Sequence, residues 1–308
     1  MTNINEAIRN VRKEVSKGIF GQDMVFDQIL CALIAGGHCL LEGPPGVGKT
    51  LLARSLTKVL DLSFSRVQFT PDLMPTDILG VNIIDPKSQS FVFKKGPIFS
   101  DIVLADELNR SPARTQAAML EAMAERQISM DGSTYPLPSG FMVIATQNPF
   151  EYEGTYGLPE AQLDRFLMKV KVSYPTKEKA RVLLASDLSI ELEKVLSKDS
   201  LETMRQAVRD VFIEDKILDY VNDLIHLTRE MPEIVIGASP RASLMLVRAA
   251  KGWALIQGRD FVIPEDVQQM AKPVLAHRFR LSPDAEIDGL TPEKCLDKLF
   301  KKMEVPRS

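Results

Sequence analysis

Residues 43–50 read Gly-Pro-Pro-Gly-Val-Gly-Lys-Thr, between a short apolar run, His38–Leu41, and a helix-forming run, Leu51–Leu60. Glycines at these positions let backbone N–H groups curl around phosphate oxygens without a Cβ in the way. The following helix N-terminus favours a bound anion. In this pattern Lys49 reaches the β- and γ-phosphates and Thr50 ligates Mg²⁺. The stretch predicts binding of a nucleoside triphosphate; the alternative is a purely structural glycine turn.

The expected nucleotide contacts are the residues of this loop and of the first helical position after it. They are Gly43, Pro44, Pro45, Gly46, Val47, Gly48, Lys49, Thr50 and Leu51.

Composition places the chain among ordinary globular proteins. Of its 308 residues 45% are hydrophobic and 26% charged, and a net charge of −3 indicates neither nucleic acid nor an anionic membrane as a general partner. Met1–Arg12 lacks a signal-peptide apolar region, and no apolar stretch is long enough to span a bilayer, so we expect a cytoplasmic protein. Cys31, Cys39 and Cys295 lack metal-ligand spacing and are expected to be buried free thiols.

The order of the predicted elements indicates two domains. Five strand-like runs alternate with helical segments, and several are continuously apolar, as in a parallel sheet covered on both faces: His38–Glu42, Ser63–Phe69, Asp101–Asp106, Phe141–Thr146 and Leu167–Val172. This predicts an α/β nucleotide-binding domain over 1–175 with a doubly wound sheet. After Pro175 an all-helical domain over 176–308 is expected, with helices at Glu178–Leu188, Leu201–Phe212, Asp215–Met231, Pro240–Gly258 and Pro264–Leu281.

Two hairpins interrupt the alternation, near residues 81–95 and 126–140. Val81–Ile84 and Phe91–Lys94 flank a polar tip, and the Asp131-Gly132 pair between the second two strands is a strong hairpin signal.

Polar side chains follow two of the apolar strands. Asp106 ends one strand and suits a Mg²⁺ site, while the adjacent Glu107 is the candidate base that activates water. Asn148 ends another strand and is expected to hydrogen-bond that water or the γ-phosphate. The alternatives are a solvated pair of charges at 106–107 and an Asn-Pro turn at 148–149.

Two arginines are candidates for contact with the transferred phosphoryl group. Arg165, before the last strand, has the character of an arginine finger. Arg241 begins a helix of the second domain, and we expect it to reach back over the nucleotide and couple that domain to it. The alternatives are a surface Arg165 paired with Asp164, and a solvated Arg241.

Taken in order, these elements resemble the Walker A, Walker B, sensor 1, arginine-finger and sensor 2 motifs of AAA+ ATPases. The chain is similar to the MoxR family in particular. Further segments support this: Phe20–Asp23, Gln68–Leu73, Gly96–Phe99, Leu104–Arg110, Thr115–Met123 and Ala276–Arg278. The hairpins near 81–95 and 126–140 resemble the helix-2 and pre-sensor 1 insertions of this clade.

The resemblance implies an ATP-hydrolysing, Mg²⁺-dependent, chaperone-like homo-oligomer, commonly a hexameric ring, that works with von Willebrand factor A-domain proteins on client proteins. It also implies that Phe20 and Gly21 border the adenine. Two other functions remain open. One is a nucleotide-switched scaffold with little hydrolysis, and the other is a DNA-acting AAA+ motor, although neither a basic domain nor a base-stacking surface is evident.

Overall fold

The computed structural model describes residues 2–87, 89–149, 156–185 and 191–306. Its helices are α1 (Thr2–Val15), α2 (Asp23–Ile34), α3 (Lys49–Val59), α4 (Pro75–Leu79), α5 (Ala113–Glu125), α6 (Glu160–Leu163), α7 (Lys177–Ala185), α8 (Lys198–Asp210), α9 (Asp215–Glu230), α10 (Pro240–Ile256), α11 (Pro264–Leu275), α12 (Pro283–Ile287) and α13 (Pro292–Lys302). Its strands are β1 (Cys39–Glu42), β2 (Phe64–Gln68), β3 (Gly80–Ile84), β4 (Phe91–Lys95), β5 (Ile102–Asp106), β6 (Gln127–Met130), β7 (Ser133–Pro136), β8 (Met142–Gln147), β9 (Met168–Lys171), β10 (Ile234–Ile236) and β11 (Arg280–Leu281).

The central sheet is parallel, with strand order β2-β5-β8-β1-β9. All five strands predicted from the sequence are therefore confirmed, with ends that differ by at most a residue or two. Because the strands are parallel, all their carboxyl ends lie on one side of the sheet and all their amino ends on the other. We call these two sides the carboxyl edge and the amino edge of the sheet. This division into two edges decides where the candidate site residues lie.

Both faces of the sheet are buried, as the continuously apolar strands predicted. Leu41, Leu104 and Ile144 point into the core that α2 and α3 cover, whereas the adjacent Leu40 and Val103 point into the core on the α5 side. Successive side chains of a strand point to opposite faces. The three central strands β5, β8 and β1 therefore contribute to two hydrophobic cores, and the fold is the doubly wound α/β layer expected.

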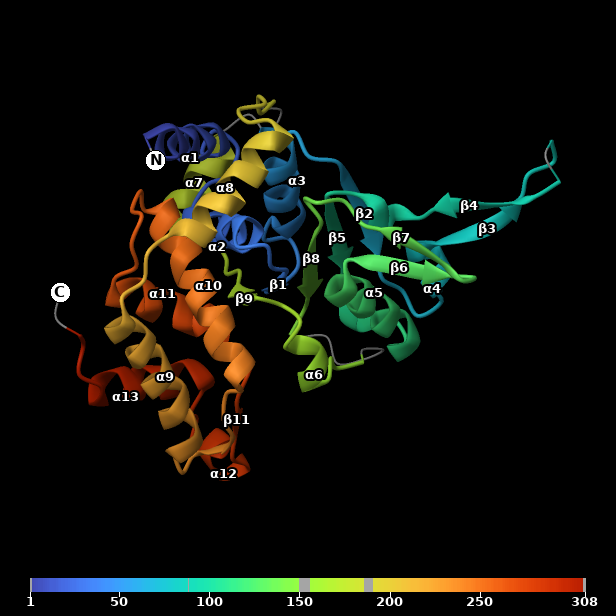
Figure 1. Ribbon diagram of the computed structural model, residues 1–308. Coiled ribbons are helices and arrows are strands. Elements are labelled where there is room, and N and C mark those ends of the chain that lie inside the picture. The colour runs from blue at the N-terminus through green and yellow to red at the C-terminus, as the bar shows by residue number, and fades with distance from the viewer. Residues whose placement is uncertain (1, 88, 150–155, 186–190, 307–308) are drawn as a thin grey trace.

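The two predicted hairpins are present as the pairs β3–β4 and β6–β7. The β3–β4 hairpin extends away from the rest of the molecule (Figure 1). The two hairpins touch, because the rings of Phe93 and Tyr135 stack with centroids 4.2 Å apart and Asn82 donates a hydrogen bond to Asp131. They form one projecting unit.

The second domain is helical except for one element that the sequence analysis missed. β10 and β11 form a two-stranded antiparallel sheet, so the prediction of an all-helical domain is wrong there. The helix expected through Leu281 ends at Leu275, because the buried Arg278 side chain donates to the carbonyl oxygens of Val274 and Phe166. Tertiary contacts thus end the helix before the apolar spacing does.

Two other predicted helices differ in their ends. The helix expected over Leu201–Phe212 runs from Lys198 to Asp210, because Phe212 instead forms a β-bridge with Phe261. The helix expected over Glu178–Leu188 is observed as α7, and residues 186–188 of it lie outside the described residues. The predicted domain boundary at 174–178 falls in the connection between β9 and α7.

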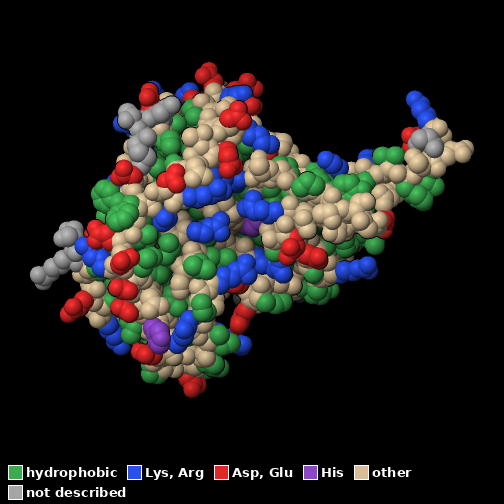
Figure 2. All heavy atoms as spheres, in the orientation of Figure 1, with side chains coloured by type: hydrophobic (Ala, Val, Ile, Leu, Met, Phe, Trp, Pro, Cys, Tyr) green, Lys and Arg blue, Asp and Glu red, His purple; other side chains and the backbone are tan. Residues whose placement is uncertain are grey.

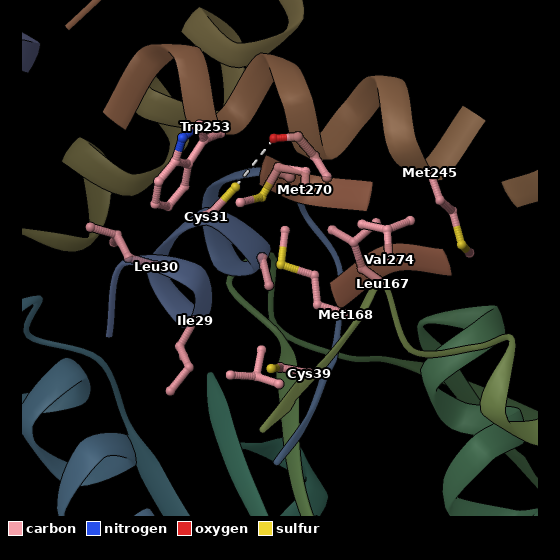
Figure 3. Packing of buried hydrophobic residues seen from close by; sticks show 14 of the residues in the cluster. Ile29, Leu30, Cys31, Cys39, Leu167, Met168, Met245, Trp253, Met270 and Val274 are labelled. Atoms are coloured by element: carbon pink, nitrogen blue, oxygen red, sulfur yellow. Dashed lines mark hydrogen bonds between the residues drawn. The ribbon is translucent and has the colours of Figure 1, made fainter. Parts of the chain in front are cut away.

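The helical domain packs directly against the α/β domain through one continuous core. Figure 3 shows α2 lying between the sheet and α10, with Cys31 and Trp253 on facing helices and Met168 of β9 close to α11. The Cys31 thiol donates to the carbonyl oxygen of Ala249 at 3.4 Å. All three cysteines are buried and free, as predicted. A large apolar interface of this kind opposes independent motion of the two domains.

Across the described residues, no helix combines the length and apolar character needed to cross a membrane.

Candidate nucleotide site

The glycine-rich loop connects β1 to the first turn of α3 at the carboxyl edge of the sheet. Gly46 and Gly48 have φ values of +78° and +86°, which side chains with a Cβ rarely adopt. No heavy atom lies within 4 Å of where a Cβ would stand at either glycine, so the loop surrounds open space. Gly43 has the opposite constraint, because a Cβ there would lie 2.1 Å from the Val172 carbonyl oxygen.

Lys49, in the first turn of α3, folds over this loop, and its ammonium group donates to the Gly43 carbonyl oxygen at 2.6 Å. The cation therefore lies at the loop, which leads directly into the N-terminus of α3. Gln22 supports the loop from outside by donating to the Val47 carbonyl oxygen at 2.5 Å. This hydrogen bond brings the preceding Phe20–Gly21 segment close to the loop. Gly21 also packs near the Lys179 side chain of α7.

The two carboxylates that end β5 are held by hydrogen bonds. Asp106 Oδ1 accepts from the Thr146 hydroxyl at 2.6 Å, and Oδ2 accepts from Arg66 at 2.6 Å. Glu107 Oε2 accepts from Gln68 at 2.8 Å and from Arg110 at 2.9 Å. The pair is therefore built into a network that spans β2, β5 and β8, unlike the solvated strand end considered as an alternative.

Strand order brings the loop, the carboxylates and Asn148 to adjacent positions. β8 lies between β1 and β5, so the residues that follow these three strands share one edge. Two strand spacings separate β1 from β5, which is about 10 Å. That distance leaves room for a phosphate chain, a metal ion and a water between them. Asn148 is buried, directly after β8.

Both candidate arginines lie at the opposite edge of the sheet. Arg165 precedes β9 and donates to the Leu120 carbonyl oxygen at 2.7 Å. Arg241 lies 3.7 Å from Asp164, the residue before Arg165, and Asp164 also pairs with Arg278 at 2.8 Å. The expectation that Arg241 reaches over the nucleotide of its own chain does not match this arrangement, because its own phosphate loop lies at the other edge. Asp164 pairs with Arg241 and Arg278.

The side chains at the carboxyl edge fit Mg²⁺-bound nucleotide. The space beside Gly46 and Gly48 is open, as a loop that takes phosphate oxygens requires. A hydroxyl from Thr50 and a carboxylate from Asp106 are the hard oxygen ligands that Mg²⁺ takes alongside water and phosphate.

Sequence reasoning missed four residues of this edge: Arg66, Gln68, Thr146 and Arg110, whose hydrogen bonds hold the two carboxylates. For Arg66 and Gln68 the sequence contained only a weak signal, namely polar residues at alternate positions near the end of the strand β2. Which strand neighbours β5 is not visible in the local pattern.

Comparison with known proteins agrees with this geometry. Residues 38–168 match the model of the ATPase family associated with various cellular activities (AAA), and residues 226–299 match the AAA lid domain. The chain is 41% identical over 305 residues to the chaperone MoxR1 of Mycobacterium tuberculosis, covering 96% of this chain and 81% of that protein. It is 33% identical to the protein MoxR of Methylorubrum extorquens, covering 93% and 91% of the two chains. The chain belongs to the MoxR family of AAA+ ATPases.

Two further relatives extend this finding. The uncharacterized protein YeaC of Bacillus subtilis is 46% identical over 281 residues, which cover 90% of this chain and 88% of YeaC. A crystal structure from Cytophaga hutchinsonii, provisionally described as an ATPase, superposes with a TM-score of 0.92 at 39% identity and covers 99% and 97% of the two chains. The MoxR-family chain is thus a nucleotide-binding ATPase with a lid domain.

Proposed function

We propose that this MoxR-family ATPase is one subunit of a homo-oligomeric ring, with the six subunits that are common in the family. In this ring, ATP hydrolysis drives remodelling, assembly or activation of a client protein. A von Willebrand factor A-domain protein is the proposed partner. The chaperone name of the M. tuberculosis relative supports the client-directed part of this proposal.

Within one subunit, residues at the carboxyl edge of the sheet bind the nucleotide and activate the attacking water. Lys49 and the loop N–H groups hold the β- and γ-phosphates, and Asn148 orients the attacking water. Glu107 accepts the proton of that water as it attacks phosphorus. Thr50 and Asp106 hold Mg²⁺, which neutralises charge on the phosphates. Phe20 and Gly21 border the base.

The observation that supports the proposed ring is the position of Arg165 at the amino edge, away from the phosphate loop of its own chain. A finger there acts on the nucleotide of a neighbouring subunit through a head-to-tail contact, and such contacts close into rings. Arg241, held beside the same segment through Asp164, then reaches that neighbouring nucleotide as well. The lid is thereby coupled to the nucleotide of the next subunit.

Mixing two inactive variants tests the shared site. Lys49→Ala removes the pocket cation and Arg165→Ala removes the finger, so each homogeneous assembly loses turnover, by several orders of magnitude for a lost finger. In a mixed ring, an intact pocket of an Arg165→Ala subunit meets the intact finger of a Lys49→Ala subunit, and phosphate release returns in part.

The control mixes Arg165→Ala with the double variant Lys49→Ala/Arg165→Ala, which offers intact pockets but no finger. Co-assembly is verified by light scattering in each case. Recovery in the control, or no recovery in the first mixture despite co-assembly, contradicts a finger supplied by the neighbour. A wild-type protein that binds ATP but shows no turnover with any partner would instead support a switched scaffold.

A further inference from the structure

A cavity of about 960 Å³ opens at the amino edge of the sheet, on the side opposite the phosphate loop. Its walls come from the C-terminal ends of α2 and α5, from α8 and α10, and from Ser139 just before β8. Cavities of this size are typical of small-molecule sites. The nucleotide site of the same chain does not reach it, because the whole length of the strands lies between the two edges.

Positive charge dominates this cavity. Its described lining contains six cationic side chains and a single acidic one, Glu202. The cations are Arg126, Arg205, Arg209, Arg241, Arg248 and Lys251. Figure 2 shows blue side chains gathered in the middle of the viewed face, in the region of α8 and α10. The chain as a whole is slightly acidic, so this concentration of charge is local.

Three arginines at the base of the cavity crowd together around the end of α2. Arg126 donates to the Gly36 carbonyl oxygen at 2.7 Å, and Arg248 donates to that of Ala35. Both guanidinium groups come within 4 Å of the position of a Cβ on Gly36. The buried Arg205 donates to the carbonyl oxygen of Leu33 at 3.2 Å.

The described hydrogen-bond partners of these three arginines are all backbone carbonyl oxygens, which carry only partial charge. Burial, and then the charge of Arg126, lowers the pKa of Arg205 to about 10 and also lowers the pKa of Arg248. Capping the C-terminus of α2 accounts for these three arginines. It does not account for Arg209, Arg241 and Lys251, which line the same open cavity and add to the repulsion between cations.

The other wall of the cavity is apolar. Leu244, Met245 and Val247 of α10 and Val208 of α8 contribute to it. Leu244 is 69% exposed although it is a leucine on a packed helix. A ligand that satisfies both walls carries several negative charges at one end and an apolar or aromatic group at the other.

We propose that this cavity binds a small organic polyphosphate, with its phosphates on Arg126, Arg248 and Lys251 and its apolar part against Leu244. Arginine forks match phosphate oxygens in pairs. A bound polyanion also removes the mutual repulsion of the cations, so it stabilises the folded chain. Since Arg241 lines the same cavity, such a ligand lies next to the residues proposed to act on the neighbouring nucleotide.

Calorimetric titration of the full-length protein tests this site. The Lys49→Ala variant is used without added nucleotide or Mg²⁺, because loss of the loop cation limits competition from the phosphate loop. Inorganic tripolyphosphate and inositol hexakisphosphate are the probes, with a glutamate octapeptide and a single-stranded oligonucleotide as other anions. We expect one tripolyphosphate site per chain, an affinity that falls as salt rises, and a raised melting temperature.

Replacing Arg126 and Arg248 together by Gln retains amide donors for the Gly36 and Ala35 carbonyl oxygens but removes two charges. We expect at least a tenfold loss of tripolyphosphate affinity in this double variant and less than a twofold loss in Arg280→Gln, which changes an exposed lid arginine outside the cavity. Unchanged circular dichroism shows that the double variant folds. If it does not fold, Lys251→Gln and Leu244→Ser provide the comparison.

Equal affinity of the wild type and the folded charge variants overturns the proposal, and so does the absence of binding at millimolar probe. Tighter binding of the peptide or the oligonucleotide than of both polyphosphates also overturns it, because the cavity is then a docking site for a macromolecule. None of these readouts depends on ATP hydrolysis, so failure of this proposal is distinguishable from failure of the proposed ring.

Discussion

Glu107 occupies a backbone conformation that non-glycine residues rarely adopt, with φ of 57° and ψ of 48°. The Glu107 N–H donates to the Thr146 hydroxyl at 2.9 Å, and the same hydroxyl donates to Asp106. Thr146 therefore holds both carboxylate-bearing residues from the neighbouring strand. Local strain kept in place by surrounding contacts is common where a side chain must be aimed at a reacting group.

The Glu107→Gln variant should bind ATP normally and hydrolyse it at least about 100-fold more slowly, because an amide does not accept the proton of the attacking water. Phosphate release measures hydrolysis, and fluorescent ATP-analogue titration measures binding. Glu121→Gln, an exposed glutamate of α5, serves as the control. Hydrolysis by Glu107→Gln at the wild-type rate would show that Glu107 is not the base.

His38 is buried and has both ring nitrogens engaged. Its Nδ1 accepts from the Val143 N–H at 3.0 Å, and its Nε2 lies 3.2 Å from the Met123 carbonyl oxygen, to which it donates. A proton added at Nδ1 would face the Val143 N–H. Burial, followed by the charge of Arg126, lowers the pKa of His38 to about 3.

This residue makes stability depend on pH. Below the ordinary histidine pKa of about 6.5, the unfolded chain takes up a proton at His38 that the folded chain does not. The contribution of neutral His38 to the unfolding free energy is therefore fully present above pH 6.5 and is lost as the pH falls toward 3. From pH 7.5 to 5 we expect His38 to account for a loss of about 2 kcal/mol in unfolding free energy.

Urea unfolding at the two pH values measures this loss. His38→Gln is expected to have a smaller pH dependence than the wild type, even if it is less stable overall. The exposed His226→Gln should keep the wild-type dependence. An identical slope in His38→Gln and the wild type would contradict the assignment.

At the scale of elements, the α2–α10 contact joins the two domains. Gly252 lets the two helices approach closely, since a Cβ on it would lie 3.0 Å from Cys31 Sγ and 3.4 Å from the Cys31 carbonyl oxygen. Trp253, next along α10, packs into the same core. The lid is therefore fixed on α2 by close packing.

Gly252→Val should lower the unfolding free energy by about 1–3 kcal/mol, because overpacking separates α10 from α2. Leu244→Val puts the same β-branched residue on an exposed position of the same helix and should cost much less. Urea titration compares the two variants. Equal losses would contradict a tight interface at Gly252, because helix propensity alone favours valine over glycine and leucine over valine.

At the scale of the whole molecule, the two edges of the sheet have separate roles. The carboxyl edge has the phosphate loop and the carboxylates, and the amino edge has Arg165, Arg241 and the basic cavity. In the proposed ring, a subunit with this polarity presents its arginines to one neighbour and its nucleotide to the other, which is a head-to-tail contact.

Arg241 provides a test of this polarity that is independent of Arg165. Arg241→Ala should reduce ATP turnover, and mixing it with Lys49→Ala should restore part of it, because the intact pocket then receives both arginines from the Lys49→Ala neighbour. If Arg241 served the nucleotide of its own chain, the same mixture would stay inactive. Arg280→Ala, another exposed lid arginine, should leave turnover unchanged. Phosphate release from verified mixed assemblies distinguishes these outcomes.

The sequence by itself determined the features that depend on neighbouring residues. The phosphate loop needs glycines at fixed spacing, the apolar strands need burial on both faces, and Asp131-Gly132 needs a left-handed turn, at φ values of 49° and 79°. Asp106, Glu107 and Asn148 were candidates because each ends or closely follows an apolar strand, and strands that run in the same direction place them at one edge.

Only the tertiary structure decided which strands are neighbours and which segments meet across the fold. It placed Arg241 beside Asp164, ended α11 at Leu275 through Arg278, and gathered six cations from three separate stretches around one cavity. Strand order and helix packing depend on contacts between residues far apart in the chain. Local periodicity does not encode such contacts, because the apolar face of one amphipathic helix can pack equally well against several different elements.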